Sequence, residues 1–154
     1  ENKTIERFDT LFIQLPDGTR DSEASFIDPI LSDMFIVSKR EDSVRLYQFS
    51  NTWKSGDTLT AELKIKMPYN LTVAANISVD GTEVLLKNYD HIYYWKRKGT
   101  EAIADLLQQT PVELKYKPEK QGESIAWSRD GLGYYTLGES TTHGRARLLY
   151  YKRK

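Results

Sequence analysis

The feature that most constrains the fold is an internal repeat with a period of about 50 residues. Three segments each place a polar residue before a short apolar run and end that run with Asp-Pro or Asp-Gly; they span residues 23–29, 76–81 and 123–131. Their aspartates, Asp28, Asp80 and Asp130, lie at strand ends as Asx turns require and are predicted to hold turns. A single repeat unit of this length cannot bury its own apolar face, so neighbouring units are predicted to stack on one another.

Further apolar runs of strand length follow each copy of the repeat. A second strand is predicted at residues 34–39, 84–87 and 134–137, and a third at residues 44–49, 92–96 and 146–151. Residues 58–66 and 112–116 alternate apolar and polar side chains, which predicts a fourth strand in the first two units. Residues 8–15 form one more strand before the first unit.

This strand content equals three four-stranded blades, which indicates an all-β fold and a β-propeller fragment. The predicted units are residues 20–67, 70–117 and 120–154, and the strand 8–15 is expected to belong to an adjacent or closing blade. A β-sandwich or barrel is the alternative, but neither has a reason to reuse one four-strand pattern at a near-constant period.

Propellers typically close with about four to eight blades, so three blades are expected to form half of a six-bladed ring. The other blades come either in cis, from a longer parent chain, or in trans, from a second copy that makes a dimer. Position 1 is Glu and not Met, which favours the longer chain.

Composition argues against two classes of partner. The chain has 22 basic and 22 acidic residues and a formal net charge of zero, so it has no excess of positive charge to attract nucleic acid. It contains no apolar run long enough to span a bilayer. Cysteine is absent, which leaves the redox compartment open, and no signal peptide is present.

One segment departs from the β pattern. Residues 101–108 follow the hydroxyl side chain of Thr100, carry acidic residues in the first turn and precede Pro111, which together predict a short helix. The helix is expected on the outer rim of the second blade, as a solvated decoration or, less favoured, as a partner contact.

The first strand of each unit should line the central channel. Glu23, Asn76 and Glu123 are aligned at the starts of these strands, with Asp21 two residues before Glu23 and therefore on the same strand face. Carboxylates converging on a channel mouth suit calcium, which takes about six to eight oxygen ligands. Asp21, Glu23 and Glu123 are the predicted metal ligands. The alternative is that these carboxylates form structural ion pairs with nearby basic residues.

The complete predicted binding set joins these residues to the polar side chains at the same end of the ring. It consists of Asp21, Glu23, Lys39, Arg40, Glu41, Asn76, Lys87, Glu123, Glu139 and His143.

Nucleophilic catalysis has little support in the sequence. The histidines are His91 and His143, and no Gly-x-Ser-x-Gly segment is present. His91 is expected at a strand end, and His143 lies in a polar loop that approaches the channel beside Glu139. The sequence lacks the closely spaced His or Cys residues that a zinc site needs. The third strands carry the aromatic runs 93–95 and 150–151. Alternate rings of these runs are expected to pack between blades while the others face outward, with a carbohydrate or peptide platform as the alternative.

Four segments in order, residues 20–24, 38–41, 72–78 and 121–127, resemble the C-terminal half of a family of largely uncharacterised bacterial β-propeller proteins. That family is distantly similar to phytase-like and esterase-like propellers. The resemblance runs from about Phe8 to Tyr151 and implies a propeller fold in an exported protein, periplasmic or extracellular, but no established reaction. Asn76 stands where the family favours an acidic residue.

Two functional classes follow. The favoured one is a non-catalytic propeller module that binds a ligand or partner on its acidic channel face, with calcium as a cofactor that organises the loops. The alternative is a calcium-assisted phosphoesterase of the phytase-like kind, in which the metal offsets substrate charge and activates water. Binding is favoured because only Lys39, Arg40 and Lys87 are available to hold a phosphate.

Overall fold

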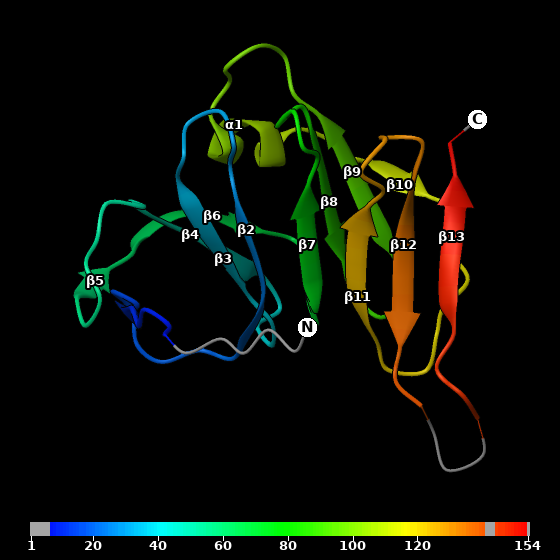
Figure 1. The fold of residues 1–154 in the computed structure, drawn as a ribbon, viewed down its shortest axis with the longest axis horizontal. Helices are drawn as coiled ribbons and strands as arrows, with labels where there is room; N and C mark the ends of the chain where they lie inside the picture. Colours follow the sequence, from blue (N-terminus) through cyan, green and yellow to red (C-terminus); the bar gives the residue numbers. More distant parts are fainter. Residues whose placement is uncertain (1–6, 141–143, 154) are drawn as a thin grey trace.

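The computed structural model describes residues 7–140 and 144–153, whose strands form three successive antiparallel sheets, here blades A, B and C (Figure 1). Blade A contains β2 (Ser22–Ile27), β3 (Met34–Ser38), β4 (Val44–Phe49) and β6 (Glu62–Met67) in that order. Blade B contains β7 (Ala74–Ile77), β8 (Glu83–Lys87), β9 (Ile92–Lys96) and β10 (Val112–Leu114). Blade C contains β11 (Gly122–Trp127), β12 (Gly133–Gly138) and β13 (Leu148–Lys152).

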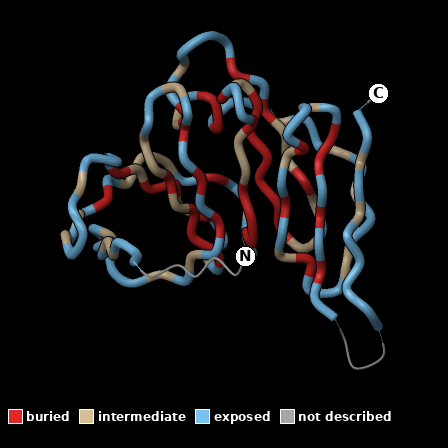
Figure 2. Tube along the Cα trace, in the orientation of Figure 1, coloured by how far each residue is buried: buried red, intermediate tan, exposed pale blue. Residues whose placement is uncertain are grey.

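The blades stack through their first strands, because β2 lies beside β7 and β7 beside β11. Alternation along β2 sends Ala24 and Phe26 toward blade B, where they are 1% and 7% exposed, and turns Ser25 and Ile27 to the opposite side. One core therefore lies between blades A and B and a second between blades B and C. Figure 2 shows the burial concentrated in β3, β4, β7 and β8, whereas β13 is largely exposed.

The strand register gives the repeat a period of 50 residues. Ala24 pairs with Val37, Ala74 with Lys87 and Ser124 with Leu137 in the first two strands of the three blades. This register corrects the alignment predicted from the sequence, because Asn76 corresponds to Phe26 and Ala126. The residue of blade B that corresponds to Glu23 and Glu123 is Val73.

The alignment of the three units that the sequence predicted was out of register because it treated the turn aspartates Asp28, Asp80 and Asp130 as equivalent, which they are not. The backbone N–H groups of Asp28, Ser78 and Ser128 each donate to the carbonyl oxygen five residues ahead, so these three residues begin the turns. Asp80 and Asp130 lie two residues later, where each accepts a hydrogen bond from the serine hydroxyl. All three aspartates hold turns, as predicted, but from two different positions.

Strand β1 (Phe12–Gln14) pairs in parallel with β5 (Thr58–Thr60) and covers the outer part of blade A. Ile13 and Leu59 of this pair pack, together with Met34 and Ile36, against the buried residues Tyr47, Phe49 and Ala61. The N-terminal strand was predicted to join an adjacent or closing blade, whereas in this structure its partner is the segment between β4 and β6.

The predicted short helix is confirmed, but its environment differs from the prediction. Helix α1 (Ile103–Gln108) begins after Ala102, and no side chain caps its first turn, so Thr100 has no capping role. Ile103, Leu106 and Leu107 are buried in the core between blades A and B. The helix therefore fills the gap between β6 and β9 and is not a solvated decoration.

A buried ion pair joins the turn of blade A to blade B. Arg97 Nη1 lies 2.9 Å from Asp28 Oδ1, and both side chains are fully buried. The same carboxylate oxygen accepts the backbone N–H of Ile30, and Arg97 also donates to the carbonyl oxygens of Gly81 and Glu101. The turns meet so closely that a Cβ at Gly81 would lie 2.7 Å from the Ile30 side chain.

Among the described helices, none has the length and apolar composition needed to cross a membrane.

Candidate functional site

Three of the predicted site residues come together where the innermost strands of the blades begin. Lys39 Nζ lies 2.7 Å from Glu23 Oε1 and 3.5 Å from Glu123 Oε1. It also donates to the hydroxyl of Tyr89, 3.1 Å away, and this hydroxyl donates to Glu123. These four residues, the channel cluster, connect all three blades.

The carboxylates of the channel cluster are placed by β-bulges. The register shifts between Ser22 and Ala24 in blade A and between Gly122 and Ser124 in blade C, so Glu23 and Glu123 are the extra residues of their strands. A bulge re-aims the side chain that it carries. Here both bulges direct a carboxylate to the same lysine.

Lys39 is the electrostatic centre of the cluster. Its side chain is only 4% exposed. Burial lowers the pKa of Lys39, but the hydrogen bonds to Glu23 and Tyr89 outweigh burial and hold the pKa above its ordinary value. The ammonium group is therefore charged at neutral pH and balances the adjacent carboxylates.

Asp21, Arg40 and Glu41 make pairs of their own. Arg40 is an exposed side chain that bonds Asp21. Glu41 accepts from Arg20 at 2.9 Å and from Arg45 at 3.2 Å, which places it in a separate group of charges.

Lys87 is buried at the boundary between blades B and C. Its Nζ donates to the carbonyl oxygens of Gly122 and Asn88 and lies 4.8 Å from the ring centroid of Tyr116. Burial lowers the pKa of Lys87 to about 8, against the attraction of carboxylates that include Glu119. A Cβ at residue 122 would lie 2.8 Å from the Tyr116 hydroxyl, so a larger residue there would have to displace the Tyr116 side chain.

The remaining predicted residues are dispersed. The side-chain oxygen of Asn76 accepts the backbone N–H of Trp127, which fastens blade B to blade C. Glu139 is exposed, and its backbone N–H donates to Gln121. His91 lies 2.8 Å from Glu113 at the outer strands, and His143 falls outside the described residues.

The described part of the chain contains no group of three or more His, Asp or Glu side chains that is arranged to hold a metal ion. At the channel cluster the position between the two carboxylates is taken by Lys39. This geometry corresponds to the structural ion pairing that the sequence left open beside calcium.

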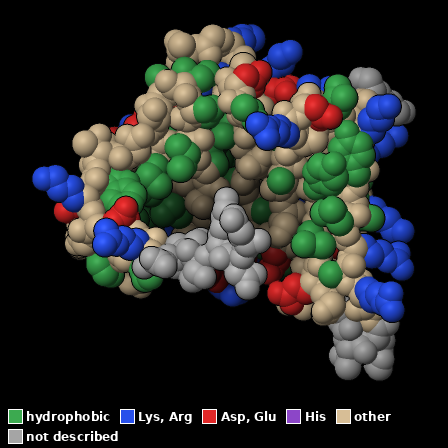
Figure 3. Space-filling view, viewed as in Figure 1, with side chains coloured by type: hydrophobic (Ala, Val, Ile, Leu, Met, Phe, Trp, Pro, Cys, Tyr) green, Lys and Arg blue, Asp and Glu red, His purple; other side chains and the backbone are tan. Residues whose placement is uncertain are grey.

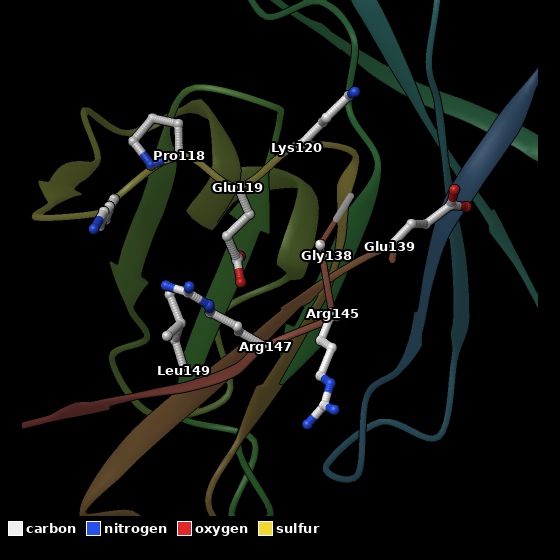
Figure 4. A pocket seen from close by; sticks show the side chains of 10 residues that line it. Pro118, Glu119, Lys120, Gly138, Glu139, Arg145, Arg147 and Leu149 are labelled. Carbon is white, nitrogen blue, oxygen red and sulfur yellow. The ribbon is translucent and has the colours of Figure 1, made fainter. Parts of the chain in front are cut away.

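A cavity of about 310 Å³ lies next to the start of β11 and the end of β12. Basic and acidic side chains both line it; the lining residues are Lys117, Pro118, Glu119, Lys120, Gly138, Glu139, Gly144, Arg145, Arg147 and Leu149. In Figure 4 Glu119 points into the cavity, whereas Glu139 and Lys120 point away from it.

A larger hollow of about 800 Å³, the aromatic groove, separates the outer strands of blades B and C. It is lined by Glu83, Tyr94, Lys96, Leu114, Lys115, Trp127, Gly133, Tyr134, Tyr150, Tyr151, Lys152 and Arg153. The blades diverge away from the channel, so their inner strands touch while the outer strands leave this wedge.

The aromatic rings of the groove form a continuous series. Tyr94 and Trp127 meet edge to face with centroids 6.2 Å apart, and Trp127 and Tyr134 meet the same way at 6.1 Å. Tyr134 then stacks on Tyr151 at 5.0 Å. Such pairs hold their rings in fixed orientations, so the apolar wall is preformed.

One carboxylate organises the polar side of the groove. Glu83 accepts the hydroxyl of Tyr94 and pairs with Arg153, whose guanidinium lies 5.3 Å from the Trp127 ring centroid. Burial and the bond to Glu83 raise the pKa of Tyr94 to about 12, so its hydroxyl stays protonated. Glu83 is thus already paired, while three lysines of the rim, Lys96, Lys115 and Lys152, are exposed.

This groove was not predicted from the sequence. The prediction was that alternate rings of the third strands pack between blades, but the groove also takes Trp127 and Tyr134 from the first two strands of blade C. The sequence does carry a signal for the groove, namely aromatic residues on several strands that face the boundary between blades B and C. These residues can be recognised as one group only once the strand register is known.

The stacked antiparallel sheets, each with its first strand innermost, define the chain as part of a β-propeller. No known family model matches the chain, and no curated protein sequence matches it. Among solved structures it is similar to the β-propeller domain of Cps50 (Swd1) from Myceliophteria thermophila, with 15% identity and a TM-score of 0.49 over 83% of this chain and 40% of that one.

A second similar structure is KlAtg21 in its complex with the coiled coil of AgAtg16. The identity is 17% and the TM-score 0.45, over 82% of this chain and 38% of that one. The chain thus spans about 40% of the length of the propellers it matches.

Proposed function

We propose that the chain is a non-catalytic β-propeller binding module whose partner occupies the aromatic groove. The observation that carries the proposal is the hollow of about 800 Å³ with its wall of ordered rings. Ligand sites in proteins are typically concave and mostly apolar, about 300–1,000 Å³ in volume, with a few placed polar groups. Here Glu83, Tyr94 and Arg153 supply those groups.

The partner is an acidic peptide segment that also carries aromatic or aliphatic side chains. The rings of Trp127 and Tyr151 offer apolar surface, and Lys96, Lys115 and Lys152 place positive charge around it. The groove's carboxylate, Glu83, is already paired with Arg153, so it does not cancel the charge of the lysines. Opposite charges around an apolar centre favour association and orient the bound segment.

The channel end is a less favourable place for the partner. Glu23 and Glu123 are satisfied by Lys39 and Tyr89, so binding a cation there has to displace an internal ion pair. Calcium, the phosphoesterase alternative and an exported bacterial setting related to phytase-like propellers remain predictions from the sequence. Further blades, in cis or in trans, complete the ring in this proposal.

The test uses a fluorescein-labelled peptide in which Glu and Phe alternate, with anisotropy as the readout. Wild-type protein should bind it, and the same peptide with Lys in place of Glu should bind much more weakly. The double variant Lys96→Glu/Lys152→Glu should weaken binding by about tenfold, a loss of about 1.4 kcal/mol. Both side chains are exposed, so the fold is expected to persist.

The double variant Lys54→Glu/Lys66→Glu is the matched control, since both lysines are exposed and lie outside the groove. It makes the same change of charge as the groove variant and should leave the affinity unchanged. Equal weakening by the two double variants would show that general charge alone attracts the peptide. Absence of binding by wild-type protein would also refute the proposal.

A further inference from the structure

The cavity of about 310 Å³ lies between blades B and C, at the opposite end of the strands from the aromatic groove. One wall is the connection between β10 and β11, and the other is the connection between β12 and β13 with the start of β13. Leu149 of this second wall lies two residues before Tyr151 and shares its strand face, which packs against the core between blades B and C. The cavity is therefore formed inside the blade array and does not lie on the outer face of its first or last blade.

The side chain of Glu119 is held in place at one wall of the cavity. Gly122 and Gly138 lie opposite each other in the register of β11 and β12. A Cβ at residue 122 would lie 3.0 Å from Glu119 Cβ, and a Cβ at residue 138 would lie 3.1 Å from the same atom, so the two glycines leave room for this side chain. The hydroxyl of Tyr116 accepts the backbone N–H of Glu119 at 3.2 Å and donates to Oε2 at 3.3 Å. These contacts fix the direction of the carboxylate.

The other oxygen of this carboxylate has no bonding partner. Glu119 Oε1 is buried and accepts no hydrogen bond from residues 7–140 or 144–153. The nearby ammonium group of Lys87 instead donates to the carbonyl oxygens of Gly122 and Asn88. In Figure 4 Glu119 points across the cavity toward the wall that carries Arg147. Because a buried carboxylate oxygen without a donor is unfavourable, this atom favours a donor that enters the cavity.

The opposite wall carries positive charge. Arg145 and Arg147 line the cavity from the segment that precedes β13, and both side chains are exposed. Neither arginine bonds Oε1 of Glu119. Figure 3 shows Lys and Arg side chains predominating over Asp and Glu along the edge of the molecule at β13. Since an arginine fork binds a carboxylate through two parallel hydrogen bonds, this wall suits the acidic group of a ligand.

We propose that the cavity binds a small zwitterion of the size of a free amino acid with an aliphatic side chain. The ammonium group donates to Glu119 Oε1, the carboxylate accepts from Arg147, and the aliphatic side chain lies against Pro118 and Leu149. The volume is at the lower end of the range of about 300–1,000 Å³ for small-molecule sites. An anion alone leaves Oε1 without a donor, and a cation alone leaves the arginines unpaired, so a ligand with both charges fits best. This site is separate from the aromatic groove and does not depend on the partner proposed there.

NMR titration of the isotope-labelled 154-residue protein with L-leucine tests this inference. L-Leucine should shift the amide signals of Gly138 and Glu139 with a dissociation constant of about 1 mM or lower. 4-Methylpentanoate, which lacks the ammonium group, and L-leucinamide, which lacks the carboxylate, should each bind at least about tenfold more weakly. Equal affinities for the three ligands would overturn the proposal, as would the absence of shifts at about 10 mM L-leucine.

Two variants assign the two charges. Glu119→Gln should weaken L-leucine about tenfold and leave 4-methylpentanoate unchanged, because that ligand has no ammonium group. Arg147→Gln should weaken L-leucine to a similar degree and leave L-leucinamide unchanged. Arg129→Gln, which changes an exposed arginine of the blade C turn outside the cavity, is the control and should not alter binding.

Equal weakening of all three ligands by Glu119→Gln would show that this residue only shapes the cavity, and it would overturn the assigned contact. The comparison of ligands uses wild-type protein, so it decides the proposal even where a variant does not fold.

Discussion

At the scale of single residues, two buried lysines show how the neighbours of an ammonium group decide its chemistry. Lys39 is 3% exposed and Lys87 is fully buried, and both lie at the ends of second strands. Lys39 meets carboxylates, whereas Lys87 meets mainly carbonyl oxygens and a ring. The pKa values of the two lysines consequently shift in opposite directions.

Replacing Lys39 by Met should destabilise the protein by about 1.5–3 kcal/mol at pH 7, the range for a lost hydrogen bond to a charged group. Since the pKa of Lys39 is raised by folding, its stabilisation is fully present at neutral pH and is lost only when the pH rises through that pKa. Adding Glu23→Gln and Glu123→Gln to the variant should recover part of the loss, because the carboxylates no longer face each other unbalanced.

Urea denaturation measures these differences, and calcium provides an independent check. Wild-type protein should show the same midpoint with and without calcium, because Lys39 already balances Glu23 and Glu123. A midpoint that rises with calcium would instead identify the carboxylates as metal ligands. An unchanged stability of Lys39→Met would show that the channel cluster does not hold the blades together.

Lys87 should make stability increase with pH. Its pKa falls on folding from an ordinary value of 10.5 to about 8, so between these values the unfolded chain binds more protons than the folded one. Relative to Lys87→Met, wild-type protein should gain about 2 kcal/mol between pH 7.5 and 9.5. Denaturation at the two pH values measures the gain, and a difference that stays constant would contradict it.

At the scale of elements, the fold depends on turns and a helix that connect blades. The Asp28–Arg97 pair joins the turn of blade A to the end of β9, and α1 fills the space beside it. Removing one member of a buried pair leaves an uncompensated charge, whereas replacing both by apolar residues is often tolerated.

Arg97→Leu should therefore cost about 3–5 kcal/mol in the free energy of unfolding. The double variant Asp28→Leu/Arg97→Leu should be clearly more stable than Arg97→Leu, because no charge is left unpaired. A matched control is Arg129→Leu, which removes an exposed arginine from the corresponding turn of blade C and should change stability little. Losses that simply add in the double variant would show that the pair is not coupled.

At the scale of the whole molecule, blade B is the stable centre because it packs against a neighbour on each face. In a repeat array stability approximates a sum of unit terms and interface terms, so units with one neighbour open more readily. Amide hydrogens of β8 should exchange more slowly than those of β13, as measured by mass spectrometry. Equal protection of the two strands in monomeric protein would indicate that the array opens as one unit.

Most of the fold could be predicted from the sequence because its signals are local. Period-2 alternation, turn residues and the repeat predict the all-β class and stacked units of four, four and three strands, which the structure confirms. Ion pairing of Glu23 with a nearby basic residue such as Lys39 was also predicted from the sequence, as the alternative to a calcium site. The place of Asn76 was wrong, because the turn aspartates mark different positions in blades A and B.

The sequence alone thus determined the repeat and the strands, since both arise from spacings within about 50 residues of one another. Only the tertiary structure decided which side chains meet across blades. The contact of Tyr89 with Glu123 depends on a bulge and on the packing of blade on blade, and the aromatic groove exists because flat sheets that touch near the channel diverge outside it. Neither the contact nor the groove is encoded in any single segment of the sequence, because each results from how two blades pack on each other.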